Sequence, residues 1–303
     1  MSQDNVAKGF FPKGFVPVVA AGFCWSLGAI FIKHMVDPYS YRLPYLSFRG
    51  LSIAFVLLLY LFIKEGPAFV KNFAKLGKSG LIGACSLVMA FYGFVFSVTM
   101  TTAALALFMV ALTPFIASII GYIVLKETVR PRTIVSIVIA FTGVMVMVSE
   151  GTVGGTLWGG LVGFLSAVGF AVYSVTLRWR PETPKFTTSA TAGLLCGLLS
   201  WLICLVLGIE FQMPAININL SLVNGSVLGL GFLLYSMGAK YLSAAEATVL
   251  AQLEVVGGVF WVWLPIIGIN ETPSATTLLG GIMILMAIAL HSFAVKKVIQ
   301  PPI

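Results

Sequence analysis

Two glutamates interrupt a long apolar stretch of the sequence, S-A-A-E-A-T-V-L-A-Q-L-E-V-V (residues 243–256). The chain holds only ten acidic residues, so two of them in one hydrophobic segment need a chemical explanation. Glu246 stands three residues after Ser243, and Ser-x-x-Glu before an apolar run is the capping-box pattern, in which each side chain satisfies a backbone donor of the first helical turn. We therefore expect Glu246 to cap a helix, with a gating role as the alternative.

Glu254 lies deeper in the same segment, about ten residues or roughly 15 Å along a helix. No helix cap is expected at that depth, and an ionisable side chain at the centre of a membrane helix costs at least ~2.5 kcal/mol. A buried pair, or a protonated carboxyl group bonded to a backbone carbonyl, is one explanation. Binding of a substrate ammonium group, or carriage of a proton, is the other. Gly257 and Trp261 follow on the same helix face, and this combination suits an organic cation or a zwitterion.

Three aromatic residues are further candidates for contact with such a ligand. Trp25 is expected near the middle of the first apolar run, although tryptophan usually prefers the membrane interface and its indole N–H needs a partner. Tyr92 and Tyr235 lie at comparable places in later apolar runs. Aromatic rings near a carboxylate can bind an ammonium group by cation–π attraction. Each of the three can equally serve as an ordinary core residue.

Two cations and one pair of helix-weakening residues complete the set of candidates. Lys33 and Arg49 are expected about a turn from the outer surface, where they extend to the lipid headgroups or form a positive outer vestibule for a substrate carboxylate. Pro114 removes one backbone hydrogen bond from its helix and can produce a kink that serves gating. Gly258 stands 144 residues later, so the two form a candidate pair of hinges.

The elements that must position these residues are membrane helices, because 59% of the side chains are hydrophobic and only 9% are charged. A soluble domain is about a quarter charged, and several runs reach the ~20 residues needed to span a bilayer. We predict an all-α polytopic membrane protein with ten transmembrane helices. Their expected ranges are 15–36, 45–63, 79–97, 101–125, 132–149, 157–177, 188–208, 224–240, 244–267 and 275–294.

The sequence argues against an enzyme. It contains only two histidines, and its four cysteines show no CxxC pair or metal-ligand spacing. No Ser/His/Asp set and no phosphate-binding loop is evident. We therefore expect no catalytic residue, no metal site and no cofactor. The expected partners are a small-molecule substrate and the lipid bilayer, with proton coupling open, and the protein is expected to be a monomer or a homodimer.

The distribution of basic residues predicts the orientation. With the N-terminus inside, fifteen of the eighteen Lys and Arg residues fall in inside segments, Lys33 and Arg42 lie towards the outside, and Arg49 lies within the second span. By the positive-inside rule both termini are cytoplasmic. The net charge of +8 is thereby explained by topology, without a nucleic-acid partner. A bacterial inner membrane is the expected location.

An internal repeat divides the chain into two halves. A shift of 144 residues superimposes the first five predicted spans on the last five, and it aligns K-E-T (126–128) with N-E-T (270–272). The predicted organisation is a cytoplasmic segment (1–14), a first repeat (15–149), a second repeat (157–294) and a cytoplasmic tail (295–303). Because five is odd, the second repeat must be inverted, an arrangement typical of secondary transporters with a site near the bilayer midplane. A duplicated channel remains the alternative.

Several motifs resemble the EamA-type families of the drug/metabolite transporter superfamily. They are W-S-L-G-A-I-F-I-K (25–33), Arg49, Thr113-Pro114, L-K-E-T (125–128), L-E-V-V (253–256), W-V-W-L (261–264), N-E-T-P-S (270–274) and Gly280-Gly281. Val255 replaces a proline that is common in the family. The resemblance covers about residues 15–295. It implies ten helices in inverted repeats around a central cavity, and transport of metabolites such as amino acids or of quaternary and lipophilic cations.

Overall fold

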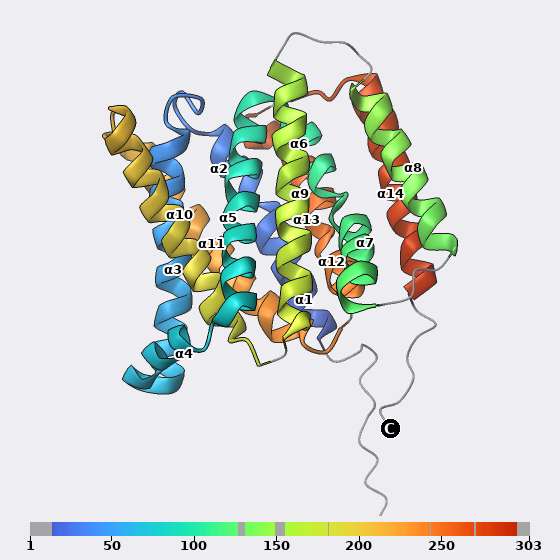
Figure 1. Cartoon of the computed structure of the whole chain (residues 1–303). Coiled ribbons are helices and arrows are strands. Elements are labelled where there is room, and N and C mark those ends of the chain that lie inside the picture. The colour runs from blue at the N-terminus through green and yellow to red at the C-terminus, as the bar shows by residue number, and fades with distance from the viewer. Residues whose placement is uncertain are drawn as a thin grey trace, which may run out of the picture.

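The computed structural model describes residues 14–126, 131–148, 155–180, 182–242, 244–269 and 271–295, with the side chains of 148, 155, 156, 244–246 and 291–295 left aside. Within these ranges every regular element is a helix (Figure 1). The elements are α1 (Phe15–Ser26), α2 (Gly28–Lys33), α3 (Arg42–Glu65), η1 (Gly66–Val70), α4 (Lys71–Ala74), α5 (Gly77–Met100), α6 (Ala103–Val110), α7 (Thr113–Leu125), α8 (Pro131–Val148), α9 (Gly155–Trp179), α10 (Lys185–Leu207), α11 (Ala215–Ala239), α12 (Ala244–Ala251), α13 (Leu253–Trp263), η2 (Pro265–Ile267) and α14 (Ala275–Val295).

Seven helical segments in the described residues are long and apolar enough to cross a membrane. They are Phe15–Lys33, Arg42–Ala74, Gly77–Met100, Ala103–Leu125, Leu157–Trp179, Lys185–Leu207 and Ala215–Ala239. Three further apolar segments, Pro131–Met147, Ala247–Trp263 and Ala275–Leu290, are shorter and coincide with the other three predicted spans. The all-helical, multi-pass character of the chain is confirmed, while the exact count of ten and the side of the termini stay predictions.

The helices pack as two like halves. A shift of 144 residues takes the segment α1–α2 onto α9, α3 onto α10, α5 onto α11 and α8 onto α14. The most extensive contacts are the same when each helix is replaced by its counterpart. The contact of α5 with α9 corresponds to that of α1 with α11, while α3 packs on its own counterpart α10, and α8 on α14. Such a pattern arises when a two-fold axis relates the halves, so the repeat seen in the sequence is also present in the packing.

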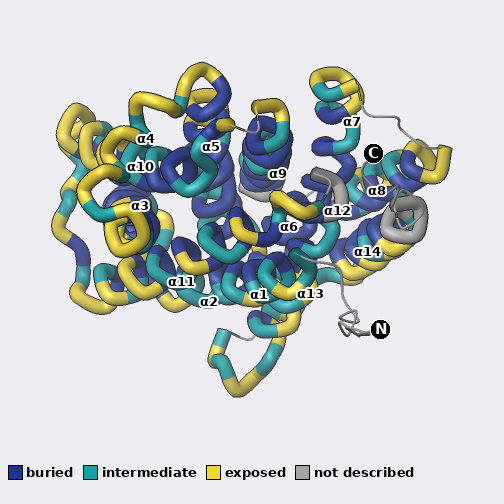
Figure 2. The backbone as a smooth tube through the Cα atoms, turned by 90° about the horizontal axis from the view of Figure 1, so that it is seen from below, coloured by how far each residue is buried: buried dark blue, intermediate teal, exposed yellow. Residues whose placement is uncertain are grey.

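The outer surface of the bundle is apolar, as a lipid environment requires. Large hydrophobic side chains such as Phe55, Ile63, Met145 and Val206 are exposed, with Ile63 at 75%. Figure 2 shows buried backbone in the middle of the bundle and exposed backbone around its periphery. In water such a surface would cause aggregation, but in a bilayer it faces hydrocarbon, and the helices keep their backbone hydrogen bonds internal.

Small residues bring the helices of the two halves into close contact. Gly143 of α8 faces Gly280 of α14, and a Cβ added to Gly143 would lie 2.7 Å from the Gly280 carbonyl oxygen. Gly50 of α3 is as tightly placed, with Gly197 N at 2.7 Å from the same hypothetical atom. Membrane helices associate through close packing of this kind, because lipid chains are as apolar as leucine.

Three of the predicted spans are broken within the described residues, and two of these three are equivalent in the repeat. The span predicted at 101–125 divides into α6 and α7 at Ala111–Leu112, and the span at 244–267 divides into α12 and α13 at Gln252. The kink expected near Pro114 is present as the first break, while the second break lies at Gln252 and not at Gly258. Pro114 explains the first break, because its ring has no N–H and collides with the preceding turn.

The second break occurs without proline. Val255 stands where the families that the sequence resembles commonly have a proline. The Gln252 side chain donates a hydrogen bond from Nε2 to the Thr248 carbonyl oxygen at 3.2 Å. The Gln252 backbone N–H bonds to Val249 O instead, at 3.1 Å, in the tighter i−3 pattern. Competition between a side chain and the backbone for the same carbonyl bends helices. A third break, at Leu27 between α1 and α2, has no counterpart in the continuous helix α9.

Candidate central binding site

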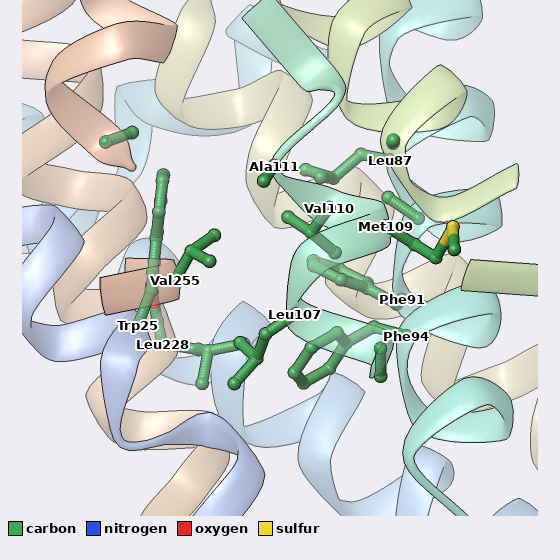
Figure 3. Packing of buried hydrophobic residues seen from close by; sticks show 14 of the residues in the cluster. Trp25, Leu87, Phe91, Phe94, Leu107, Met109, Val110, Ala111, Leu228 and Val255 are labelled. Atoms are coloured by element: carbon green, nitrogen blue, oxygen red, sulfur yellow. The ribbon is translucent and has the colours of Figure 1, made fainter. Parts of the chain in front are cut away.

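A cavity lies between the two halves, with seven lining residues from the first half and five from the second. The space free of atoms, including the solvent that opens onto it, is about 410 Å³. Aromatic rings form much of the wall, from Trp25, Phe91, Phe94, Phe170 and Phe232. Figure 3 shows this apolar packing around Val110, with Trp25 and Val255 to one side and Phe91 and Phe94 to the other. A site between inverted repeats is where secondary transporters hold their substrate.

Glu254 lines the cavity from the first turn of α13. As expected, no side chain caps a helix at this depth, but the break at Gln252 starts a new helix there. The positive end of the α13 dipole therefore favours a negative charge on Glu254. The side chain is partly exposed, and no hydrogen bond or ion pair to it is formed among the described residues. Its carboxylate is therefore available to a ligand.

Arg49 also lines this cavity and is only 2% exposed. We expected it to extend to the headgroups or to form an outer vestibule, and it does neither. Its helix α3 turns the side chain inward, where the guanidinium carbon lies 5.4 Å from the centre of the Phe91 ring. Nε and Nη1 are buried without a hydrogen-bond partner in the described residues.

The two charges break the symmetry of the repeat. The counterpart of Glu254 under the shift of 144 residues is Val110, which lines the same cavity. The counterpart of Arg49 is Gly193. Each half thus supplies one charge of opposite sign, and the two side chains form no direct ion pair in the described part of the chain.

Trp25 is buried in the wall of the cavity, and its indole N–H has a partner. Nε1 donates to the Leu228 carbonyl oxygen at 3.4 Å. The ring packs against Phe170, Phe232 and Tyr235, with centroid distances of 5.3, 4.9 and 5.3 Å. Gly231 leaves room for it, since a Cβ there would collide with the indole nitrogen. The position of Trp25 is therefore fixed from several sides.

The two tyrosines occupy different places. Tyr235 lies behind Trp25, and its hydroxyl group pairs with that of Ser174 at 3.2 Å, so it supports the wall without lining the cavity. Tyr92 lies in a separate groove between α5 and α10, and its hydroxyl group pairs with that of Ser200 at 2.6 Å. The structure does not bring Tyr92 to Glu254.

Gly257 and Trp261 lie where α13 meets α1, outside the cavity lining. Trp261 Nε1 donates to Ser26 Oγ at 3.0 Å. A Cβ added to Gly257 would lie 2.8 Å from Ser26 Cβ. The helix face that they share is thus a packing face in this conformation, and Glu254 points into the cavity apart from it.

Lys33 is held at the end of α2 by an ion pair. Its Nζ lies 2.5 Å from Glu271 Oε1 and donates to the Thr101 carbonyl oxygen at 2.9 Å. The other carboxylate oxygen of Glu271 accepts from the Ala103 N–H at 2.8 Å. These bonds connect α2, the α5–α6 connection and the segment before α14. Lys33 is therefore engaged within the protein and is not available to a substrate carboxylate in this conformation.

The candidate gating residues differ in outcome. Pro114 is the second residue of α7, directly after the break. Gly258 is buried inside α13, six residues after the break at Gln252, and it packs against the Leu107 side chain. The second break is therefore not at Gly258. Glu246 lies in α12, but its side chain and Ser243 are outside the described residues, so the capping box stays a prediction.

Sequence reasoning missed the phenylalanines of the cavity wall and Glu271. The chain has 23 phenylalanines, and nothing in the sequence distinguishes the four that line the cavity, which are Phe91, Phe94, Phe170 and Phe232. Glu271 did carry a signal, because it lies in the N-E-T motif that aligned the repeats. Its partner Lys33 is 238 residues away, which sequence spacing does not reveal.

A helical bundle with an exposed apolar surface and a cavity between two like halves is the architecture of a multi-pass membrane transporter. The EamA-like transporter family matches residues 12–149 and 157–293, once for each half. The chain belongs to this family, and the resemblance found in the sequence is confirmed. It is accordingly an integral membrane transporter and not an enzyme.

The comparison with solved structures shows the same fold. One crystal structure, described only as that of a protein, is similar with a TM-score of 0.70 and 16% sequence identity, over 94% of this chain and 99% of that chain. At this identity the likeness concerns the fold alone. Among curated proteins, none matches the chain.

Proposed function

We propose that the protein is a secondary active transporter that moves a small polar organic metabolite, amino acid-like, zwitterionic or cationic, by alternating access of its two repeats. The observation that carries this proposal is Glu254, a carboxylate that lines an aromatic cavity between the halves and has no ion-pair partner among the described residues. A cation in such a cavity gains charge attraction from the carboxylate and cation–π attraction from the rings.

Broken helices at the cavity support alternating access. The breaks at Ala111–Leu112 and Gln252 lie in equivalent spans, one from each half. Discontinuous helices commonly form the substrate sites of secondary transporters, because their free ends offer partial charges and their two parts can move separately. The tight contact at Lys33 and Glu271 would hold one end of the bundle closed while the other end opens.

A quaternary-ammonium or lipophilic-cation transporter is the second candidate. The same five aromatic side chains and Glu254 favour it, since a large organic cation binds to aromatic faces beside a negative charge. The two candidates differ in the polar groups that the substrate must carry, and a ligand screen separates them.

The test begins with a thermal-shift screen of the purified protein against amino acids, amines, quaternary ammonium compounds and organic acids. A ligand that binds the folded state raises its stability by mass action. The best ligand is then used for uptake into proteoliposomes containing the wild type, Glu254→Gln or Glu246→Gln. We expect Glu254→Gln to abolish uptake and Glu246→Gln to retain it, because glutamine also serves in a capping box.

Counter-exchange decides between a transporter and a passive facilitator. Ligand loaded inside the vesicles should accelerate uptake of labelled ligand, and uptake should saturate. Near-normal uptake by folded Glu254→Gln would falsify the role of this carboxylate. Flux without saturation and without stimulation by internal ligand would instead indicate a channel or facilitator.

A further inference from the structure

We infer that Arg49 is an anion-binding group of the central cavity, and that the transported molecule is a zwitterion held between Arg49 and Glu254. This inference rests on the proposed function and selects one substrate class within it. The observation behind it is a buried guanidinium group with two nitrogen atoms, Nε and Nη1, that have no hydrogen-bond partner in the described part of the chain.

A buried arginine of this kind needs an acceptor. The guanidinium group stays charged at any physiological pH and offers five N–H donors. Burial of such a charge is costly unless a counter-charge and hydrogen bonds compensate it. The π face of Phe91 supplies only weak compensation at 5.4 Å. A carboxylate fits the planar donor fork in the two-bond geometry that arginine favours.

Glu254 provides the negative charge of the same cavity. It belongs to the opposite repeat and lines the same cavity, yet it forms no direct ion pair with Arg49. With both residues charged, the cavity has no net charge from this pair. A zwitterion placed between them, carboxylate to Arg49 and ammonium group to Glu254, satisfies both groups and keeps the net charge at zero.

Ligands with one charge satisfy the site less well. A simple amine would neutralise Glu254 and leave the guanidinium donors of Arg49 without an acceptor. An organic acid would bind Arg49 and leave the carboxylate of Glu254 unpaired. Buried polar groups left unpaired are the strongest basis for rejecting a near-identical ligand. The apolar lining, including Leu87, Phe94 and Leu228, further favours a zwitterion with an apolar side group.

The experiment compares ligands that share one side chain and differ in which of their two terminal groups is charged. Leucine, leucinamide and N-acetyl-leucine present a zwitterion, a cation and an anion on one carbon skeleton, and the corresponding triads of methionine and phenylalanine extend the panel. Apparent affinities come from thermal-shift titrations of the full-length protein in detergent. For at least one skeleton we expect the zwitterion to bind the wild type about 10-fold or more tightly than either singly charged analogue, as expected from loss of one charged hydrogen-bonding group.

The variants assign each charge to its residue. Arg49→Gln should weaken zwitterion binding by about 10- to 100-fold and leave amide binding unchanged or stronger. Glu254→Gln should weaken amide binding and leave the N-acetyl compound unchanged or stronger. Arg49→Lys should bind the zwitterion with intermediate affinity, because lysine keeps the charge and loses the planar donor fork.

The double variant Arg49→Gln/Glu254→Gln is the control for misfolding. It removes both charges, so it should remain monodisperse in size-exclusion chromatography even where Arg49→Gln alone, with Glu254 left unbalanced, does not. It should bind no member of the panel better than the wild type does.

Three results would overturn the inference. The first is stabilisation of the wild type by an amide as strongly as by its parent zwitterion. The second is unchanged zwitterion binding in a folded variant without Arg49. The third is the lack of stabilisation by every zwitterion in the panel. Amide binding that depends on Glu254 would leave the proposed function standing, whereas uptake insensitive to Glu254→Gln would remove both.

Discussion

Lys33 and Glu271 form an ion pair between the two halves, with Nζ and Oε1 2.5 Å apart. The pair lies at one end of the bundle, and its members are also bonded to the backbone at Thr101 and Ala103. Their side chains are only 16% and 23% exposed. The contact is therefore better shielded than a typical surface ion pair, which contributes little.

Loss of either charge should lower stability and loosen this end of the bundle. We expect Lys33→Gln and Glu271→Gln each to cost about 1.5–3 kcal/mol, the usual range for hydrogen bonds to charged groups. Thermal unfolding in detergent measures the loss, and cysteine accessibility at engineered positions near Thr101 measures the opening.

The charge-swapped variant Lys33→Glu/Glu271→Lys provides the discriminating control. A simple ion pair would be restored by the exchange. Here the swap should fail, because a glutamate at 33 cannot donate to Thr101 O and a lysine at 271 cannot accept from the Ala103 N–H. Recovery of wild-type stability in the swapped protein would show that the backbone bonds contribute nothing.

Gly143 should be intolerant of any side chain. A Cβ there meets the Gly280 carbonyl oxygen at 2.7 Å, so α8 and α14 would have to move apart. We expect Gly143→Ala to destabilise the protein by about 1–3 kcal/mol, the usual cost of overpacking.

Gly160 is the matched control for this substitution, because nothing lies within 4 Å of a Cβ built on it. Alanine favours a helix over glycine by about 0.5–1 kcal/mol, so Gly160→Ala should be neutral or stabilising. Equal melting temperatures for the two variants would contradict the close packing of α8 and α14.

Trp25 should be sensitive to substitutions that move its ring. In Gly231→Ala the new methyl group would occupy the place of the indole N–H, which displaces the ring and breaks its bond to Leu228 O. We expect weaker ligand binding in the thermal-shift titration and altered tryptophan fluorescence. Trp25→Phe should retain part of the binding, since it loses the bond and keeps an aromatic face.

Gly225→Ala is an informative comparison for that result. This substitution meets backbone, at Arg49 O of α3, whereas Gly231→Ala meets the Trp25 side chain, and the indole ring is not among the three nearest contacts of a Cβ at 225. Gly225→Ala should lower stability without the change in tryptophan fluorescence. A fluorescence change of the same size in both variants would indicate a general loosening of the bundle instead of a displaced Trp25.

The sequence was sufficient for the fold because a membrane imposes strong patterns. Hydrocarbon thickness determines span length, and the shift of 144 residues revealed the two halves. The predicted helix boundaries were less reliable where a helix contains polar residues. The span predicted to start at residue 224 starts at Ala215, since Asn217 lowers the hydropathy there although it is buried and bonded to the backbone of Val36.

Some residues of the site were predicted from the sequence and others were misplaced, and the difference has a physical reason. Glu254 and Trp25 were found because each is costly in hydrocarbon and therefore conspicuous. Arg49 was noticed but placed at the surface, because depth along a helix does not say which way its side chain turns. Tyr92 and Trp261 were conspicuous for the same reason as Trp25, yet their polar atoms are satisfied by Ser200 and Ser26.

Pro114 offers a test of whether the break between α6 and α7 serves movement. Pro114→Ala restores an N–H and removes the clash with the preceding turn, so it should favour a continuous helix. We expect a higher melting temperature and slower uptake, with ligand affinity nearly unchanged, because Val110 is the only residue near the break that lines the cavity within the described chain. Stabilised enzymes and transporters commonly lose activity in this way where function needs flexibility.

Pro17→Ala, near the start of α1 and far from the break, is the control and should leave the uptake rate as it is. If Pro114→Ala raises stability and transports at the wild-type rate, the break is a packing feature and the moving element must be sought at Gln252.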